Sequence, residues 1–194
     1  DNVVRPCILW NDGRTEKQTR YLNEVVGKEF LSENTANIAF AGFTAPKLLW
    51  IEENEPENFK KIRKIMLPKD YIAYRLTGSF TTDFSDASGT LFLDVKNKCW
   101  SQKMLDILHI DRLMLPEPKE SYEVIGRIKD GFKLKGVLVA AGAGDNAAAA
   151  IGTGATMNGA TNISLGTSGT VFTSCDKFSV GENNSLHAFC HANG

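Results

Sequence analysis

One segment, residues 136–151, limits the possible folds of this chain more than any other. Residues 136–141 (Gly-Val-Leu-Val-Ala-Ala) are a short apolar run, which predicts a buried strand. Residues 142–146 (Gly-Ala-Gly-Asp-Asn) predict a tight glycine loop, and residues 147–151 (Ala-Ala-Ala-Ala-Ile) predict the start of a helix with little side-chain bulk. Strand, loop and helix in this order are typical of α/β proteins, which bind ligands beyond the carboxyl ends of their strands.

Asp145 stands at that position and has two interpretations. Asp145 or Asn146 can cap the helix that follows. Amide donors at a helix start also favour an ionised carboxylate, and an ionised carboxylate can act as a general base. The two interpretations are compatible, and the residues alone favour the cap.

The same segment also matches a dinucleotide-binding pattern. Gly142, Gly144 and Ala147 fit G-x-G-x-x-A. However, the acidic residue expected about 20 positions later is absent. The carboxylate of Asp145 would also face the pyrophosphate, so this interpretation is the weaker one.

The rest of the chain alternates between the two element types, which predicts an α/β or α+β architecture. Its 194 residues suffice for one ordinary domain and are marginal for two. Strands are predicted at residues 5–10, 64–67, 161–165 and 170–174, and helices at 14–26, 44–51, 55–63, 68–77 and 101–109. Gly27 is expected to end the first helix, and Pro116 and Pro118 predict a hinge-like loop.

Several further residues are candidates for binding, each with an ordinary structural alternative. Residues 166–169 (Gly-Thr-Ser-Gly) can hold a phosphate through backbone amides, or form a simple hairpin turn. Trp10 can line a pocket or pack in the core, and Lys47 can bind an anion or extend along its helix. Asp83 and Asp86 can meet at a ligand, but they are interpreted as a cap and a solvated turn.

Composition excludes several classes of function. Lys plus Arg number 22 and Asp plus Glu 23, so no excess of positive charge exists to hold a nucleic acid. No apolar run approaches the ~20 residues of a membrane span.

The four cysteines are widely spaced and predict buried, reduced thiols of a cytosolic protein. His187, Cys190 and His191 lie close in sequence, but no second ligand pair supports a zinc site.

Seven segments together resemble one enzyme family. Residues 42–54 (Gly-Phe-Thr-Ala-Pro-Lys-Leu-Leu-Trp-Ile-Glu-Glu-Asn) fit the first signature pattern of the FGGY carbohydrate kinases. Residues 164–170 (Ser-Leu-Gly-Thr-Ser-Gly-Thr) resemble the second phosphate loop of that family. Five other segments are similar to its bacterial xylulokinases: 10–14, 67–71, 76–78, 83–89 and 142–146. The likeness follows the order of the family along nearly the whole chain.

The resemblance implies an α/β fold with a ribonuclease-H-like domain, as in the actin, hexokinase and Hsp70 superfamily. This domain is expected to be incomplete and to be followed by the start of a second one. Residues 1–153 would form most of the N-terminal sugar-binding domain without its first strands. Residues 154–194 would begin the C-terminal ATP-binding domain. The family's first phosphate loop and its adenosine pocket are expected outside the sequence, which would make the chain an interior piece of a longer kinase.

The resemblance also implies roles for individual residues. Asp145 corresponds to the catalytic base, Asn146 to a neighbour that hydrogen-bonds the sugar, and Trp10 to an aromatic wall of the sugar pocket. Thr167, with Gly166, corresponds to a contact with the phosphates of ATP. No metal ligand is assigned within the chain.

The activity that the resemblance implies is ATP- and Mg²⁺-dependent phosphorylation of a sugar hydroxyl, with conversion of D-xylulose to D-xylulose 5-phosphate first. A kinase of another ketose or of a sugar acid (ribulose, gluconate) and a non-catalytic sugar-binding module are the alternatives. The expected partners are the sugar and ATP, without nucleic acid or membrane, and a homodimer is left open. The expected compartment is the cytoplasm.

Overall fold

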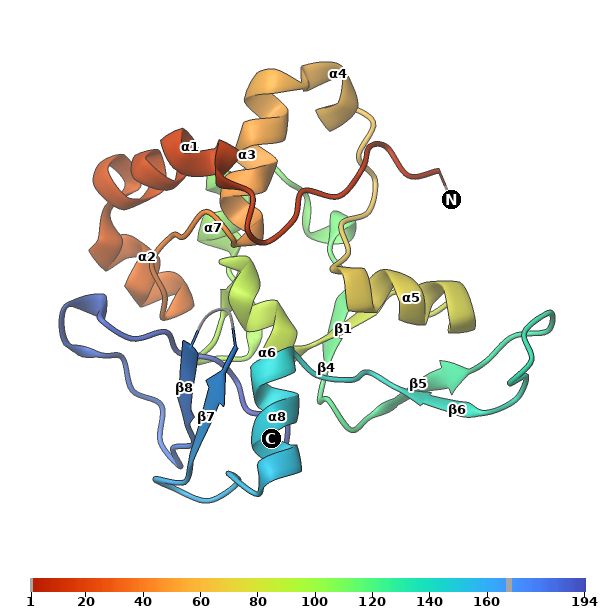
Figure 1. Ribbon diagram of the computed structural model, residues 1–194. Helices are drawn as coiled ribbons and strands as arrows, with labels where there is room; N and C mark the ends of the chain where they lie inside the picture. The colour runs from red at the N-terminus through yellow and green to blue at the C-terminus, as the bar shows by residue number, and fades with distance from the viewer. Residues whose placement is uncertain (1, 167–168) are drawn as a thin grey trace. The chain divides into compact units, whose positions relative to one another are not determined.

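The computed structural model describes residues 2–166 and 169–194, which form two compact units. The first unit contains the chain up to Ile65, together with Ser88–Leu115 and Val180–Ala188. The second contains Met66–Ala87, Phe189–Gly194 and the described part of residues 116–179. Each unit is described by itself below, with the elements labelled as in Figure 1.

The first unit is mainly helical. Its helices are α1 (Glu16–Tyr21), α2 (Lys28–Thr35), α3 (Thr44–Asn54), α4 (Pro56–Phe59) and α7 (Gln102–Ile107), with a π-helical stretch η2 (Leu22–Gly27) and short 3-10 turns η1 (Gly13–Thr15), η3 (Ser88–Thr90), η4 (Arg112–Met114) and η5 (Glu182–Asn184). Strands β2 (Leu93–Asp94) and β3 (Cys99–Trp100) pair antiparallel. Its core contains Leu22, Leu31, Phe92 and Met104, all fully buried.

One prediction for the first unit is confirmed and one is wrong. Gly27 ends the first helical stretch, as its sequence indicated: it is the last residue of η2, and its φ of 100° and ψ of 135° lie outside the helical region. A second helix, α2, begins after it and ends at Thr35. Leu31 lies fully buried on α2, so apolar packing supports the second helical stretch. Residues 5–10 form no strand, because no ladder partner lies beside them among the described residues.

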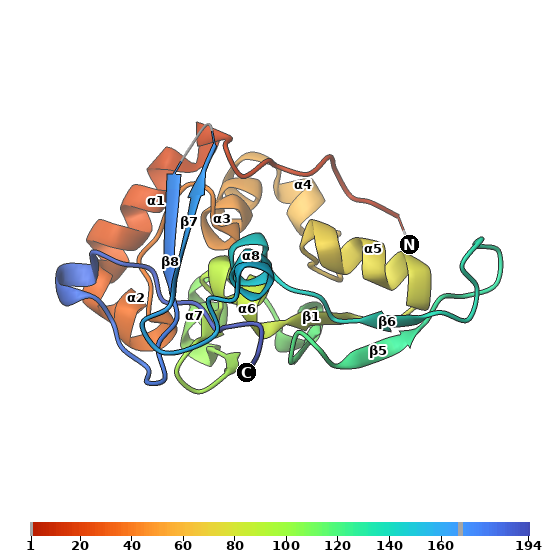
Figure 2. The same cartoon turned by 60° about the horizontal axis from the view of Figure 1, so that its bottom comes forward.

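The second unit combines helices with pairs of strands. Helices α5 (Pro68–Thr77), α6 (Phe84–Ala87) and α8 (Asp145–Thr153) accompany the strands β1 (Thr81–Asp83), β4 (Glu117–Lys119), β5 (Val124–Arg127), β6 (Leu138–Ala140), β7 (Thr161–Leu165) and β8 (Gly169–Thr173). β1 pairs parallel with β4, whereas β5 with β6 and β7 with β8 pair antiparallel. Figure 2 shows the β7–β8 hairpin beside α8, in agreement with their contacts.

Most elements of the second unit follow the predictions. α5 ends where Gly78 takes a left-handed φ of 86°, as its sequence indicated. Residues 64–67 form no strand. The segment around Pro118 is not a loop but strand β4, which faces Thr82 of β1. Proline is tolerated there because, in the described part of the chain, β4 pairs with β1 alone and needs no amide donor on its other edge.

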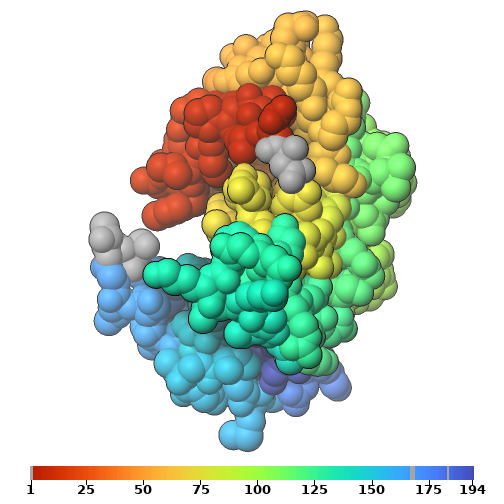
Figure 3. Space-filling model, turned by 90° about the vertical axis from the view of Figure 1, so that its right-hand side faces the viewer, coloured from red at the N-terminus to blue at the C-terminus, as the bar shows by residue number. Residues whose placement is uncertain are grey.

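Burial differs from the prediction at several positions. Strand β6 forms as expected, but Val137 and Leu138 are half-exposed rather than buried. The turquoise atoms of the β5–β6 hairpin lie at the surface on the face that Figure 3 shows. Of the cysteines, only Cys190 is buried, and no disulfide joins the four.

Among the described residues, no helix has both the length and the apolar character needed to cross a lipid bilayer.

Candidate functional site

Asp145 is the first residue of α8 and follows the loop of residues 141–144. The N-cap of the helix is Gly144, and no side chain caps it, so the predicted capping role of Asp145 or Asn146 is wrong. The Asp145 carboxylate is exposed within its unit, and its Oδ1 accepts a hydrogen bond of 2.8 Å from the Asn146 amide. An exposed carboxylate at a helix start is available to a ligand.

The loop before Asp145 is bound at three points. Gly144 donates its amide to Ser85 Oγ at 2.9 Å, and Gly142 donates its amide to the Ser121 carbonyl at 3.0 Å. The carbonyl of Ala141 accepts from Lys69 Nζ at 3.1 Å. Gly142 has a left-handed φ of 81°, and a Cβ there would lie 3.2 Å from Lys69 Cδ. The predicted glycine loop therefore has a left-handed residue that favours glycine, and close neighbours.

A buried group of charges lies behind this loop. Lys69 Nζ is 2.8 Å from Asp70 Oδ1 and 3.0 Å from Asp83 Oδ1, and both aspartates are almost fully buried. Burial lowers the pKa of Lys69, but the two carboxylates outweigh it and raise that pKa overall. Burial raises the pKa of Asp70 against the opposing effect of Lys69. Asp83 precedes α6 and its Oδ2 accepts the Ser85 amide at 2.9 Å, which confirms the predicted cap. The predicted solvated turn is wrong, because Asp83 is buried in β1 and burial also affects Asp86.

Asp86 connects this group to the glycine loop. A Cβ added to Gly144 would lie 3.4 Å from Asp86 Cα and 3.5 Å from its Oδ1, so α6 packs closely on the loop. Burial raises the pKa of Asp86 to about 6, and Lys69 opposes this while Asp70, Asp83 and Asp145 add to it. Four carboxylates and one ammonium group thus share this part of the second unit.

The glycine-rich segment 166–169 follows β7 in the sequence, and its last residue, Gly169, begins β8. The register pairs Leu165 with Gly169, so the predicted hairpin is confirmed in its strands. Gly166 is an exposed bend at the end of β7. Thr167, the predicted phosphate contact, lies outside the described residues.

Trp10 belongs to the first unit and is 74% exposed, so it is not a core residue. Its carbonyl oxygen would lie 2.9 Å from a Cβ on Gly42, which means that any side chain at position 42 would displace one of the two backbones. Lys47 Nζ donates to the Gly42 carbonyl at 2.8 Å, and burial lowers the pKa of Lys47. Gly42 therefore allows the Trp10 segment to lie against the start of α3.

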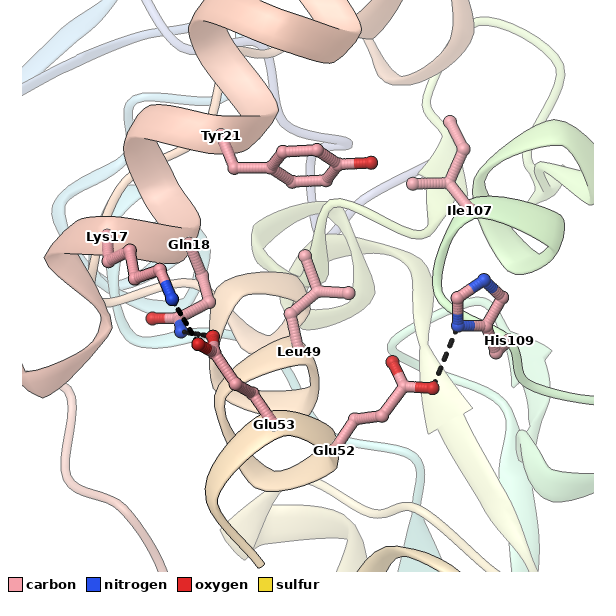
Figure 4. Close-up of a pocket in the computed structure, with 8 residues that line it drawn as sticks. All are labelled: Lys17, Gln18, Tyr21, Leu49, Glu52, Glu53, Ile107 and His109. Carbon is pink, nitrogen blue, oxygen red and sulfur yellow. Dashed lines mark hydrogen bonds and ion pairs between the residues drawn. The ribbon is translucent and has the colours of Figure 1, made fainter. Parts of the chain in front are cut away.

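The first unit also has a hollow of about 450 Å³, drawn in Figure 4, that contains none of the predicted site residues. Leu49 and Ile107 line it together with charged side chains that already pair with one another. His109 Nδ1 lies 2.8 Å from Glu52 Oε1, and Glu53 pairs with Lys17. The charged groups of this hollow are thus paired internally, whereas Gln18 Oε1 is buried and has no hydrogen-bond partner among the described residues.

Sequence reasoning missed Lys69, Ser85 and Ser121, although all three hold the loop before Asp145. They come from three separate segments that the β1–β4 pairing brings together. Lys69 follows a proline that starts a helix, and Lys69 and Ser85 lie in segments 67–71 and 83–89, which resemble the family. These features could have directed attention to the two residues, but they do not indicate contact with the loop.

The comparisons with known proteins agree with one another. Residues 1–152 match the family model "FGGY family of carbohydrate kinases, N-terminal domain". The chain is 50% identical over 173 residues to a xylulose kinase of Lactococcus lactis, covering 87% of this chain and 34% of that protein. It is 42% identical over 194 residues to a xylulose kinase of Escherichia coli, covering 98% of this chain and 40% of that protein.

Structural similarity is equally close. A crystal structure from Brucella ovis, described as a xyloylose kinase, matches with a TM-score of 0.93 and 40% identity over 99% of this chain and 40% of that one. The expected ribonuclease-H-like fold, incomplete in extent, is thereby confirmed. The chain spans between 34% and 40% of the length of these three proteins. On this evidence the chain belongs to the FGGY family of carbohydrate kinases.

Proposed function

We propose that the whole protein transfers the γ-phosphoryl group of ATP to a hydroxyl of D-xylulose and releases D-xylulose 5-phosphate. The observation that carries this proposal is the exposed carboxylate of Asp145 at the start of α8, directly after the glycine loop. The similarity to xylulose kinases over nearly all of the chain supports the substrate. Residues 1–153 are assigned to the sugar-binding domain and 154–194 to the start of the ATP-binding domain.

Asp145 is the proposed general base. Its carboxylate would accept the proton of the attacking hydroxyl as the oxygen–phosphorus bond forms, and ADP would leave with the electrons of the broken bond. The Asn146 amide would orient the sugar by hydrogen bonds, and the ring of Trp10 would cover an apolar face of it. The amides and hydroxyl of the Gly166–Thr167 turn would hold phosphate oxygens of ATP.

Mg²⁺ is the proposed metal, and it would neutralise charge on the phosphates when it is bound. Mg²⁺ prefers carboxylate oxygens and keeps several waters, and no residue of this chain is proposed as its ligand. The proposed compartment is the cytoplasm, where ATP is available. No nucleic-acid or membrane partner is proposed, and size-exclusion chromatography distinguishes a monomer from a homodimer.

A coupled assay of ADP release from the whole protein tests this function. The panel contains D-xylulose, D-ribulose, a deoxyketose, D-gluconate and glycerol, each with and without Mg²⁺. The highest kcat/KM is expected for D-xylulose. A higher value for ribulose or gluconate would reassign the substrate. Sugar binding without ADP release from any member would instead identify a non-catalytic module.

A further inference from the structure

The three contacts that hold the loop before Asp145 all lead to one buried carboxylate. Ser85 Oγ donates to Asp83 Oδ2 at 2.5 Å, and Ser121 Oγ donates to the same oxygen at 2.7 Å. Lys69 Nζ lies 3.0 Å from the other oxygen, Oδ1. Asp83 is completely buried, so it cannot exchange these partners for water. It acts as a common anchor for residues from α5, α6 and the segment after β4.

The direction of each hydrogen bond through Ser85 is fixed by chemistry. A backbone amide can only donate, so the oxygen of Ser85 accepts from Gly144, and its single hydroxyl proton is left for Asp83. The oxygen lone pairs of Ser85 then face the loop and accept the amide of Gly144 at 2.9 Å. Gly144 is the N-cap of α8, and Asp145 is the next residue. A chain of two hydrogen bonds thus connects the buried anchor to the backbone that carries the proposed base.

A purely structural explanation of this arrangement is weak. Removing charges from water costs several kcal/mol for each ion, and well-packed apolar residues often stabilise a protein better. Directional hydrogen bonds do what apolar packing cannot, because they fix a backbone group at one place and angle. Catalytic groups need such placement, since a misplacement of 1 Å can cost about 100-fold in rate.

We infer that Ser85 is a positioning residue for the reaction, holding the Gly144 amide, and with it Asp145, at the place set by Asp83. This inference rests on the proposed function of Asp145 as the general base. Lys69 supports the same loop at its first residue, where its Nζ donates to the carbonyl of Ala141. Neither side chain needs to touch the substrate.

Ser121 provides a matched comparison. Ser85 and Ser121 are both buried, and both donate to the same oxygen of Asp83. The Ser121 hydroxyl donates to Asp83, whereas Gly142 of the loop donates to the Ser121 backbone carbonyl, which an alanine keeps. Ser85→Ala and Ser121→Ala therefore remove the same bond to Asp83, and only Ser85→Ala also removes the acceptor of the Gly144 amide.

The experiment measures kcat, KM and amide hydrogen exchange for the whole protein and both variants. We expect Ser85→Ala to lower kcat with D-xylulose by about 10- to 100-fold, while KM for sugar and ATP changes less than about threefold. Exchange in the peptide over residues 141–147 should become at least about tenfold faster in Ser85→Ala. Ser121→Ala should lose similar thermal stability but keep a much larger share of kcat.

Equal losses of kcat in the two variants would overturn the inference, since only the shared bond to Asp83 would then matter. Unchanged exchange at residues 141–147 in Ser85→Ala would overturn it as well. If Ser85→Ala fails to fold, Ser85→Cys is used in its place. A thiol leaves no cavity and is only a weak acceptor, so the same loss of kcat and faster exchange are expected. Absence of sugar phosphorylation by the unsubstituted protein would refute the proposed function, whereas the exchange data would still report whether Ser85 holds the loop.

Discussion

Replacing Asp86 with asparagine should stabilise the second unit, and more so at neutral than at acidic pH. The folded-state pKa of Asp86 is about 6, compared with an ordinary value of 3.8, because burial opposes its ionisation. The folded state therefore binds the Asp86 proton more tightly than the unfolded state does. Stability must then fall as the pH rises from about 4 to about 6, because ionisation is easier once the chain unfolds.

The size of this effect follows from the two pKa values. A difference of about two pKa units at about 1.4 kcal/mol each gives a cost of about 3 kcal/mol at pH 7.5. At pH 4.5 the same relation leaves about 1 kcal/mol, because the folded state is then still protonated. Asp86→Asn removes the ionisation, so its stability gain should be about 2 kcal/mol larger at pH 7.5 than at pH 4.5.

Native-state hydrogen exchange of the peptide over residues 81–87 measures the free energy of opening at both pH values, after correction for the intrinsic exchange rate. Asp130→Asn is the control, because Asp130 is 82% exposed and pairs with Lys135 at the surface. The control should change by less than about 0.5 kcal/mol at either pH. An equal effect of Asp86→Asn at pH 4.5 and 7.5 would refute the reasoning, because it would show that Asp86 ionises as easily in the folded state as in the unfolded one.

Three further predictions concern binding and the glycine loop. Thr167→Val should raise KM for ATP more than KM for sugar in steady-state kinetics, because valine keeps the shape but loses the hydroxyl donor; a selective loss of sugar affinity would contradict the assigned role. Trp10→Ala should raise KM for the sugar about tenfold with a smaller effect on kcat, and an unchanged KM would remove Trp10 from the sugar pocket. Gly142→Ala should destabilise by about 1–2 kcal/mol in thermal melts because of its left-handed φ. Gly152→Ala, inside α8 with open space around it, should instead stabilise by about 0.5–1 kcal/mol, and equal effects of the two would contradict the backbone argument.

The sequence predicted those elements whose signal is local. The helix that starts at Pro68 and ends at Gly78 has both a start and a stop residue, and α5 follows them. The β7–β8 hairpin has two β-rich runs around a glycine turn, and its strands were likewise predicted. Gly27 was predicted to end a helix, and η2 ends there, but the helix α2 that follows was not predicted, and the burial of Leu31 shows that tertiary packing supports it.

Long-range pairing explains what the sequence did not predict. Pro118 indicated a loop, but the parallel partner β1 turns its segment into an edge strand. The position of Asp145 at the start of α8 was predicted because strand, loop and acid are consecutive in the sequence. Ser85 and Lys69 were missed because their contact with the loop depends on how β1 and α5 pack, which no short pattern contains.

The most direct test of the central claim is the rate of sugar phosphorylation by the Asp145→Asn variant of the whole protein. Asparagine keeps the shape of the side chain and removes its ability to accept a proton. D-xylulose binding, measured by calorimetry, should stay within about threefold of the unsubstituted protein, while kcat should fall by about 100- to 10,000-fold. The product is measured by mass spectrometry of the sugar phosphate under single-turnover conditions, which separates the chemical step from product release. A phosphorylation rate within about threefold of the unsubstituted protein would contradict the role of Asp145 as the general base.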